Sequence, residues 1–364
     1  MKFSEEFRDE SLVKVASSRL ARYEGYEATI MEVCGTHTMS AARFGLRFLL
    51  PSGISLISGP GCPVCVTDQR DIDAFLSIAQ LPGVILVTFG DMMRVPGSST
   101  SLERLRAEGI DVRVVYSPMD AVSIARENPL REVVFLGIGF ETTTPGTAVA
   151  VRSACEEGLQ NFSVYCCHKT MPPALRALLS SGDVAISGLL LPGHVTTIIG
   201  ARAYEFIPRE FNVPCAVAGF EPLDMLMAIE MILHQIAERN PRVENAYWRA
   251  VNEFPNELAR ALMAEVFVPA DSVWRGIGVI PGSGMELAPK YSEFDAKKRY
   301  ADVIPSVQST SNTLCRCGEV LRGVIPPTKC SLFGRSCTPT TPVGPCMVSS
   351  EGACAAAYKY GSIE

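Results

Sequence analysis

Cysteines gathered at one end of the chain constrain this sequence more than any other feature. The chain has thirteen cysteines in 364 residues, and Cys62 and Cys65 form a C-x-x-C pair in its first quarter. Six others lie within the last fifty residues: Cys315, Cys317, Cys330, Cys337, Cys346 and Cys354. Where thiols are kept reduced, clustered cysteines are metal ligands or redox groups more often than structural disulfides. The layout predicts a sulfur-rich metal site and a separate thiol loop, in a protein that moves electrons or handles iron.

Composition and charge exclude several classes of protein. The chain is 47% hydrophobic and 20% charged, which is typical of a globular protein. Its net charge of −6 provides no basic surface, so we expect no nucleic-acid partner. No stretch of about 18 uncharged apolar residues is present, so we expect no membrane span. The first ten residues are too charged for a secretory signal, and we therefore expect a cytoplasmic protein.

Short apolar runs alternate with amphipathic segments between about residues 28 and 240. The predicted strands are Ile54–Ser58, Val84–Phe89, Val112–Tyr116, Val133–Ile138, Ser163–Cys167, Ala185–Leu190 and Ala216–Ala218. The predicted helices include Asp71–Ala79, Met119–Arg126, Gly146–Glu157, Pro173–Ser181 and Pro222–Arg239. Near-continuous apolar strands separated by helices indicate parallel sheets covered on both faces. The predicted fold class is therefore α/β, with two similar parallel-sheet units that divide near Ser117.

The predicted domains follow from this division. The first α/β unit spans 24–117 and the second spans 118–225. A third, partly helical domain combines 1–23 with 226–364, and its helical stretch is Val243–Val266. From about residue 300 the sequence has too little periodicity to bury a core, and a bound metal cluster can supply the missing folding energy. We therefore expect this domain to carry a C-terminal iron–sulfur cluster.

Glycine-marked loops follow most of the predicted strands. They are Gly59-Pro60-Gly61-Cys62, Gly90-Asp91, Gly139-Phe140-Glu141, Pro192-Gly193-His194 and Gly219-Phe220-Glu221. Turns between strands and helices favour glycine in any protein. These loops also carry Cys, Asp, Glu and His, and ligands of parallel sheets bind at the carboxyl ends of strands. We predict a functional rim, with Cys34, Cys62 and Cys65 opening onto one cleft between the two units.

The C-terminal cysteines are consistent with more than one kind of site. A 4Fe-4S cluster needs four thiolates, and spacing alone does not select four cysteines from six. A C-x-C pair such as Cys315 and Cys317 also suits a structural zinc site with four thiolates. We favour an iron–sulfur cluster, with zinc second and with free or disulfide-linked thiols as the remaining alternative.

Two upstream thiol motifs carry further chemistry. Cys62 and Cys65 follow a predicted strand and precede a helix, whose N-terminal N–H groups favour a thiolate. That position suits dithiol/disulfide exchange or binding of a soft metal. Cys34, with His37 three residues later, suits an activated nucleophile or a thiolate/imidazole metal pair. A buried structural Cys34 is equally consistent with the local sequence.

Other cysteines and one histidine fit structural roles. Cys155, Cys166, Cys167 and Cys215 lie within apolar helix or strand patterns, so we expect them in the core. His234 lies within a long predicted helix, and we expect it on the apolar face of that helix.

Several segments together resemble the HypD family of hydrogenase maturation factors. The resemblance rests on Cys34-Gly35-Thr36-His37-Thr38, Gly59-Pro60-Gly61-Cys62-Pro63-Val64-Cys65, Gly139-Phe140-Glu141-Thr142-Thr143-Thr144-Pro145, Pro192-Gly193-His194, Gly219-Phe220-Glu221-Pro222-Leu223-Asp224 and Gly344-Pro345-Cys346-Met347-Val348-Ser349-Ser350-Glu351-Gly352-Ala353-Cys354. The motifs span nearly the whole chain, and residues 240–300 carry the least motif information.

The resemblance implies a scaffold on which the Fe(CN)2CO unit of nickel–iron hydrogenases is assembled. In that family a small partner, HypC, shares the iron, and HypE delivers cyanide that it makes with HypF. By resemblance, Cys34 would be the principal iron-site thiolate, with His37 beside it. Cys62 and Cys65 would act as a redox dithiol or as iron ligands. The chain alone is expected to be a monomer.

The resemblance also implies which cysteines hold the cluster. The spacing C-x14-C-x6-C-x16-C of the family's 4Fe-4S ligands falls on Cys315, Cys330, Cys337 and Cys354. Cys317 and Cys346 remain outside this set.

An alternative function uses the same thiols. A cluster-dependent disulfide reductase similar to ferredoxin–thioredoxin reductase needs the cluster and the Cys62/Cys65 pair, but it does not need Cys34. Whether the chain is an enzyme or a scaffold with redox activity therefore depends on Cys34.

Overall fold

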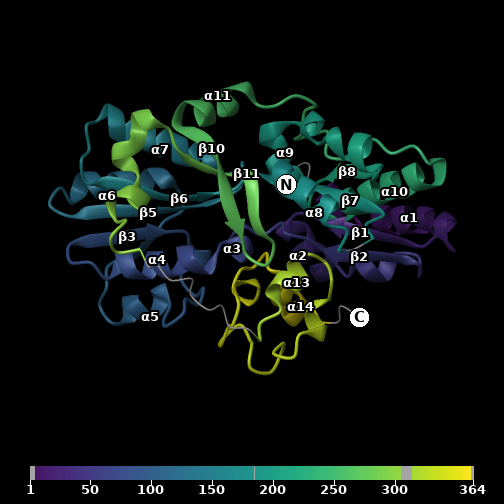
Figure 1. The fold of residues 1–364 in the computed structure, drawn as a ribbon. Coiled ribbons are helices and arrows are strands. Elements are labelled where there is room, and N and C mark those ends of the chain that lie inside the picture. The colour runs from purple at the N-terminus through teal and green to yellow at the C-terminus, as the bar shows by residue number, and fades with distance from the viewer. Residues whose placement is uncertain (1–4, 184, 305–313, 362–364) are drawn as a thin grey trace.

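The strands of this protein form two parallel sheets and one antiparallel hairpin (Figure 1). The computed structural model describes residues 5–183, 185–304 and 314–361. The first sheet has the spatial order β2 (Ile54–Ser58), β1 (Ala28–Glu32), β7 (Gly188–Pro192), β8 (Cys215–Ala218) and β9 (Val243–Asn245). The second has the order β4 (Val112–Val114), β3 (Val84–Thr88), β5 (Glu132–Gly139) and β6 (Phe162–His168). The hairpin consists of β10 (Phe267–Trp274) and β11 (Gly278–Leu287).

Helices connect and cover the strands. They are α1 (Glu10–Leu20), α2 (Gly35–Arg43), α3 (Pro63–Val66), α4 (Gln69–Ala79), α5 (Leu102–Ala107), α6 (Pro118–Glu127), α7 (Thr144–Glu156), α8 (Met171–Ser181), α9 (Gly193–Ile199), α10 (Pro222–Glu238), α11 (Glu257–Val266), α12 (Ala296–Arg299), α13 (Cys317–Leu321) and α14 (Ala353–Tyr360). Within the described ranges, none of them has the length and apolar character needed to cross a bilayer.

The sequence explains why these elements form. All residues of β3 and β7 are buried, as expected for strands covered by helices on both faces. Helix α6 begins at a capping box in which Ser117 and Asp120 bond each other's backbone N–H groups. The structure confirms the predicted α/β class with two parallel sheets.

The strand pairing differs from the predicted division near Ser117. Strands β3 and β4 precede that position, yet β3 pairs with β5 in the second sheet. Strand β7 follows it, yet β7 pairs with β1 in the first sheet. The chain thus crosses to the second sheet after β2 and returns after β6. Local patterns reveal strands but not their partners, so this exchange was not predictable from the apolar runs.

The region after α10 also differs from the prediction. The stretch Val243–Val266 is not mostly helical, because it begins with β9 and only Glu257–Val266 is a helix. The β10–β11 hairpin was not predicted, since most of β10 between its buried end residues is exposed or half-buried and lacks a continuous apolar run. The hairpin crosses the middle of the molecule between the two sheets (Figure 1). Its Trp274 is fully buried and stacks on Phe140, with ring centroids 5.7 Å apart.

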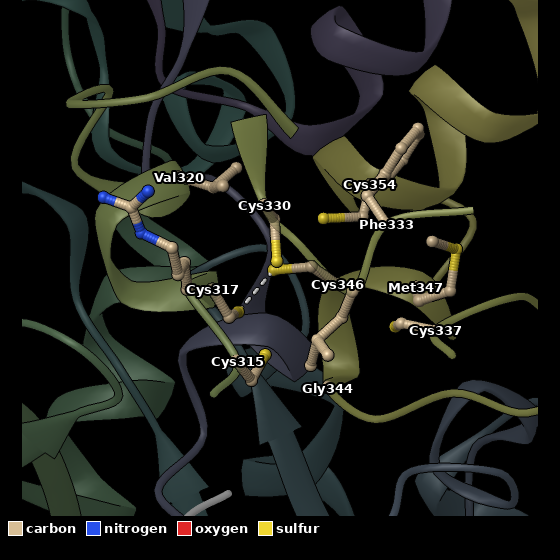
Figure 2. Close-up of a pocket in the computed structure, with 12 residues that line it drawn as sticks. Cys315, Cys317, Val320, Cys330, Phe333, Cys337, Gly344, Cys346, Met347 and Cys354 are labelled. Carbon is tan, nitrogen blue, oxygen red and sulfur yellow. Dashed lines mark hydrogen bonds between the residues drawn. The ribbon is translucent and has the colours of Figure 1, made fainter. Parts of the chain in front are cut away.

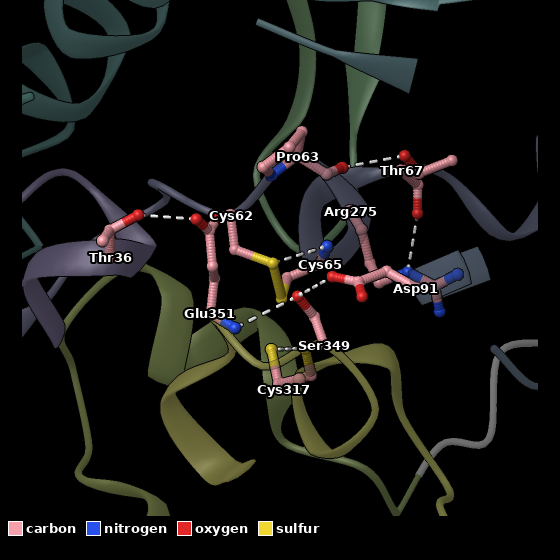
Figure 3. The surroundings of a disulfide bond; sticks show 11 residues. Thr36, Cys62, Pro63, Cys65, Thr67, Asp91, Arg275, Cys317, Ser349 and Glu351 are labelled. Carbon is pink, nitrogen blue, oxygen red and sulfur yellow. Dashed lines mark hydrogen bonds between the residues drawn. A yellow bond between two sulfur atoms is a disulfide. The ribbon is translucent and has the colours of Figure 1, made fainter. Parts of the chain in front are cut away.

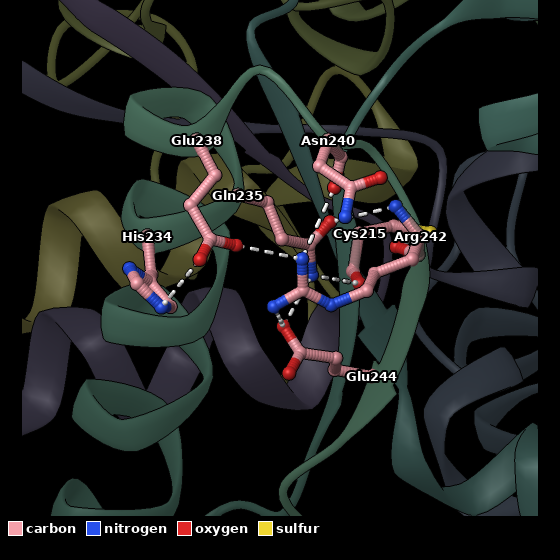
Figure 4. Close-up of polar contacts among 7 residues, drawn as sticks. All are labelled: Cys215, His234, Gln235, Glu238, Asn240, Arg242 and Glu244. Carbon is pink, nitrogen blue, oxygen red and sulfur yellow. Dashed lines mark hydrogen bonds and ion pairs between the residues drawn. The ribbon is translucent and has the colours of Figure 1, made fainter.

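The core predictions hold for the cysteines but not for His234. Cys166, Cys167 and Cys215 are buried, and Cys155 is half-buried. His234 lies on the outer side of α10, where it pairs with Glu238 at 3.2 Å (Figure 4). The buried position is the next residue, Gln235, whose amide donates to the carbonyl oxygen of Cys215 at 3.3 Å.

Candidate functional site

The carboxyl ends of strands from both sheets meet at one cleft of about 290 Å³. Loops after β1, β2, β3, β5 and β7 contribute Cys34, Gly61, Asp91, Phe140 and His194, respectively. Four of the five glycine-marked loops therefore line this cleft. The fifth loop lies behind it, where Phe220 stacks on the rings of both His37 and His194.

Cys34 occupies the N-terminal end of α2 and lines the cleft. Burial, together with the nearby carboxyl group of Glu351, raises the pKa of the Cys34 thiol to about 12. The backbone N–H groups of Thr36 and His37 oppose this shift by favouring the thiolate. Without a bound metal, Cys34 is therefore a protonated thiol at neutral pH. A metal that binds here displaces that proton.

His37 is a neutral imidazole with one free nitrogen. Its Nε2 lies 3.2 Å from the carbonyl oxygen of Ala218 and 3.0 Å from that of Gly219. Both partners are acceptors, so we assign the proton to Nε2. Burial lowers the pKa of His37 to about 4. Its Nδ1 is buried and has no hydrogen-bond partner among the described residues, and His37 does not itself line the cleft.

The Cys62–Cys65 pair forms a disulfide beneath the cleft wall (Figure 3). Cys62 precedes α3, and its Sγ accepts from the Cys65 N–H at 3.2 Å. Both side chains are almost fully buried. Neither lines the cleft, which departs from the expectation that both open onto it. Their neighbours Gly61, Pro63 and Val64 line it instead.

Gly61 joins the disulfide loop to the Cys34 loop. Its carbonyl oxygen accepts from the Gly35 N–H at 3.0 Å. A Cβ atom at position 61 would lie 2.3 Å from the backbone nitrogen of Cys34, far inside van der Waals contact. Only glycine allows this approach, so the two thiol motifs are held together by backbone contact.

The C-terminal segment closes one side of the cleft. Thr36 donates to a carboxyl oxygen of Glu351 at 2.6 Å, and Ser349 donates to Asp91 at 3.2 Å (Figure 3). Burial raises the pKa of Glu351. Sequence reasoning named Glu351 only as part of a motif, and no local signal placed it beside Cys34.

A second buried carboxyl group lies just behind the cleft. One oxygen of Glu141 accepts from the Met171 N–H at 2.9 Å, at the start of α8. The other oxygen is buried without a hydrogen-bond partner among the described residues. Burial raises the pKa of Glu141 to about 7.

All six C-terminal cysteines line one cavity of about 20 Å³, together with Arg316 and mostly apolar side chains (Figure 2). They are Cys315, Cys317, Cys330, Cys337, Cys346 and Cys354. The Cys317 and Cys346 sulfurs lie 2.7 Å apart. Both belong to the same buried cluster of side chains as Cys62 and Cys65. The structure thus brings the two thiol regions of the sequence into one core.

The donors in this cavity fit a thiolate-bound metal group. No carboxylate or imidazole lines it, so it suits soft metals. Burial and the surrounding cysteines raise the pKa of the Cys354 thiol well above its ordinary value, as expected for crowded thiols. Among the described residues, no three His, Cys, Asp or Glu side chains are already placed to chelate a single metal ion. The geometry does not choose four ligands from the six cysteines.

Comparisons with known proteins agree with the sequence motifs. The profile of a protein family described as "HypD: Hydrogenase formation hypA family" matches residues 11–361. The chain is 47% identical to the hydrogenase maturation factor HypD of Rhodobacter capsulatus, over 99% of this chain and 98% of that protein. It is 48% identical to the hydrogenase maturation factor HypD of Escherichia coli K12, over 99% and 98% of the two chains. This chain belongs to the HypD family.

Proposed function

We propose that this chain is a nickel–iron hydrogenase maturation factor that acts as the scaffold for assembly of the Fe(CN)2CO unit. HypC would share the iron, and HypE, charged by HypF, would deliver the cyanide. The observation that carries the proposal is one cleft lined by Cys34 and by the loop of Cys62 and Cys65. Membership of the HypD family supports it.

Cys34 and His37 would hold the iron substrate. The Cys34 thiol loses its proton on binding and becomes a soft thiolate ligand, which suits an iron that also carries cyanide and carbon monoxide. His37 is fully buried and does not line the cleft, and its free Nδ1 would be the second donor or a hydrogen-bond acceptor. The half-buried Phe220 ring stacks on the imidazole, and the carbonyl oxygens of Ala218 and Gly219 hold its Nε2.

The Cys62/Cys65 pair would supply the electrons for cyanide release. A thiocyanate on a partner cysteine reacts with the reduced dithiol. The products are the partner thiol, cyanide, one proton and the Cys62–Cys65 disulfide. The S–CN bond breaks, one S–S bond forms, and two electrons pass from the dithiol to the thiocyanate. The cyanide then binds the iron substrate, and the disulfide must be reduced before the next cycle.

We propose Cys315, Cys330, Cys337 and Cys354 as the ligands of a resident 4Fe-4S cluster. When bound, that cluster would supply electrons for reduction of the disulfide. The support is the cavity lined by six cysteines, which packs into the same buried core as Cys62 and Cys65.

The substitution Cys34→Ser tests the scaffold directly. It preserves shape but replaces a soft ligand with a hard hydroxyl of high pKa. We expect hydrogenase maturation to be lost while the fold and the iron of the cluster remain. Near wild-type maturation by Cys34→Ser protein would show that Cys34 is structural.

The second candidate function is a cluster-dependent disulfide reductase. It is favoured by one observation, the buried disulfide in the same core as the cysteine cavity. Such an enzyme would keep its reductase activity in the Cys34→Ser variant and lose it in Cys62→Ser. A scaffold would lose hydrogenase maturation in both variants.

A further inference from the structure

Arg275 connects the disulfide loop to the turn of the β10–β11 hairpin. Its backbone N–H donates to the carbonyl oxygen of Val66 at 2.9 Å, and its Nε donates to that of Thr67 at 2.8 Å. Its Nη1 donates to the Gln69 side chain at 3.0 Å. Figure 3 shows the Arg275–Thr67 bond beside the disulfide, with Cys317 nearby. The guanidinium is therefore fixed to Thr67 and Gln69, just after the disulfide loop.

One end of this guanidinium has no partner. Its Nη2 is shielded from solvent and makes no hydrogen bond within the described part of the chain. No carboxylate of those residues lies within ion-pair distance of Arg275 either, whereas Arg316 and Arg322 pair with Glu319 and Asp183. Buried donors that lack a partner are costly, and an arginine side chain stays charged. The site therefore carries a positive charge that no described carboxylate compensates.

The same turn contacts the cysteine cavity. Gly276 packs against Gly318 of α13, where an added Cβ would lie 2.1 Å from the Gly318 Cα atom. Gly318 directly follows Cys317. The Arg275 guanidinium also interacts electrostatically with three cysteines, Cys315, Cys317 and Cys346. The charge thus lies next to the wall of the six-cysteine cavity, although Arg275 itself does not line it.

We propose that Arg275 is a positioning residue whose fixed charge favours reduction of the group held in the six-cysteine cavity. This inference rests on the proposed iron–sulfur cluster. One-electron reduction adds one negative charge to the site, and no bond forms or breaks. The electron comes from a low-potential one-electron donor, such as dithionite in the assay. A nearby buried cation lowers the free energy of that more negative state.

The test is a redox titration of anaerobically reconstituted protein, followed by the electron paramagnetic resonance signal of the reduced cluster. We expect Arg275→Gln to lower the equilibrium constant for reduction about tenfold, which corresponds to about 59 mV for one electron. Arg275→Lys retains the charge, so its equilibrium constant should stay close to wild type. The matched control is Arg322→Gln, since Arg322 also lies next to α13 but is paired with Asp183. We expect Arg322→Gln to have the same equilibrium constant for reduction as wild type.

A second variant keeps the test decisive if Arg275→Gln does not fold. Gln69→Glu places a carboxylate at the Nη1 contact and compensates the charge while the guanidinium stays. Gln69→Glu should therefore lower the equilibrium constant for reduction, as Arg275→Gln does. If Arg275→Gln and Gln69→Glu bind the cluster and both have the same equilibrium constant for reduction as wild type, the inference alone is overturned. Wild-type protein that binds no iron under anaerobic conditions would overturn both the cluster and the inference.

Discussion

At the scale of single residues, the segments around the cleft contain buried polar atoms that lack partners among the described residues. The His37 Nδ1 and one Glu141 oxygen are both buried without hydrogen bonds in the described part of the molecule. Leaving such atoms unpaired costs about 1–3 kcal/mol each. A chain selected for stability alone would replace them with apolar groups. Their presence agrees with a site that receives a ligand.

Glu141 gives the fold a specific pH dependence. Its folded-state pKa of about 7 lies above the ordinary value of 4.5, so the folded state binds the proton more tightly. This contribution to stability is present below pH 4.5 and is lost as the pH rises through 7. We expect the free energy of unfolding to fall between these values by up to about 3 kcal/mol more than in Glu141→Gln.

Urea unfolding at a series of pH values measures this difference. The exposed Glu286 provides the control, because Glu286→Gln should leave the pH dependence of wild type unchanged. If the free energy of unfolding changes with pH equally in wild type and in Glu141→Gln, the buried carboxyl group does not titrate in this range.

At the scale of elements, the loops after β1 and β2 act as one unit. The absence of a side chain at Gly61 lets the disulfide loop lie against the backbone of Cys34. We expect Gly61→Ala to separate the loops, to cost about 1–3 kcal/mol of stability, and to reduce hydrogenase maturation strongly.

Gly146→Ala is the matched control for Gly61→Ala. Gly146 lies in α7, and the added carbon would lie 3.6 Å from Pro118 of α6, which is an ordinary van der Waals contact. That variant should mature hydrogenase normally. If Gly61→Ala behaves like Gly146→Ala in unfolding and in maturation assays, the close packing of the loops is not required.

Many of the strands were predictable from the sequence, but the way in which they pair into the two sheets was not. The predicted strand Ile54–Ser58 has the same bounds as β2, in which Ile54 and Leu56 are buried and Ser55 is exposed. Strand β7 begins three residues later than predicted, at Gly188. The β10–β11 hairpin left no continuous apolar signal because most of it is exposed or half-buried.

The candidate site was predictable only in part. Cys62 stands out because it follows a predicted strand at the carboxyl edge. Cys34 and His37 stand out only as a Cys–His pair, because the strand before them, β1, was not among the predicted strands. Glu351 and Arg275 reach the site by long-range packing, and their local sequence carries no trace of that contact. The choice of four ligands among six cysteines came from the family resemblance alone.

At the scale of the whole molecule, the tail packs beneath the junction of the two sheets (Figure 1). Its described part, 314–361, is built from short helices and turns around the cysteine cavity. We expect removal of iron by a chelator to increase proteolysis beyond about residue 300, while the sheets stay intact.

Limited proteolysis with mass spectrometry tests this, and metal analysis identifies the group that is lost. The cluster should account for about four irons, and Cys330→Ala and Cys337→Ala should lose them. Zinc in place of iron under anaerobic conditions, or an unchanged cleavage pattern after chelation, would contradict the proposed cluster.

The central claim is that this chain carries the Fe(CN)2CO unit during its assembly. Infrared spectroscopy of the protein co-purified with HypC, from cells that contain HypE and HypF, measures this directly. We predict bands in the cyanide and carbonyl stretching regions for wild type and none for Cys34→Ala with an intact fold. Wild-type complex without such bands, or Cys34→Ala complex that retains them, would contradict the account.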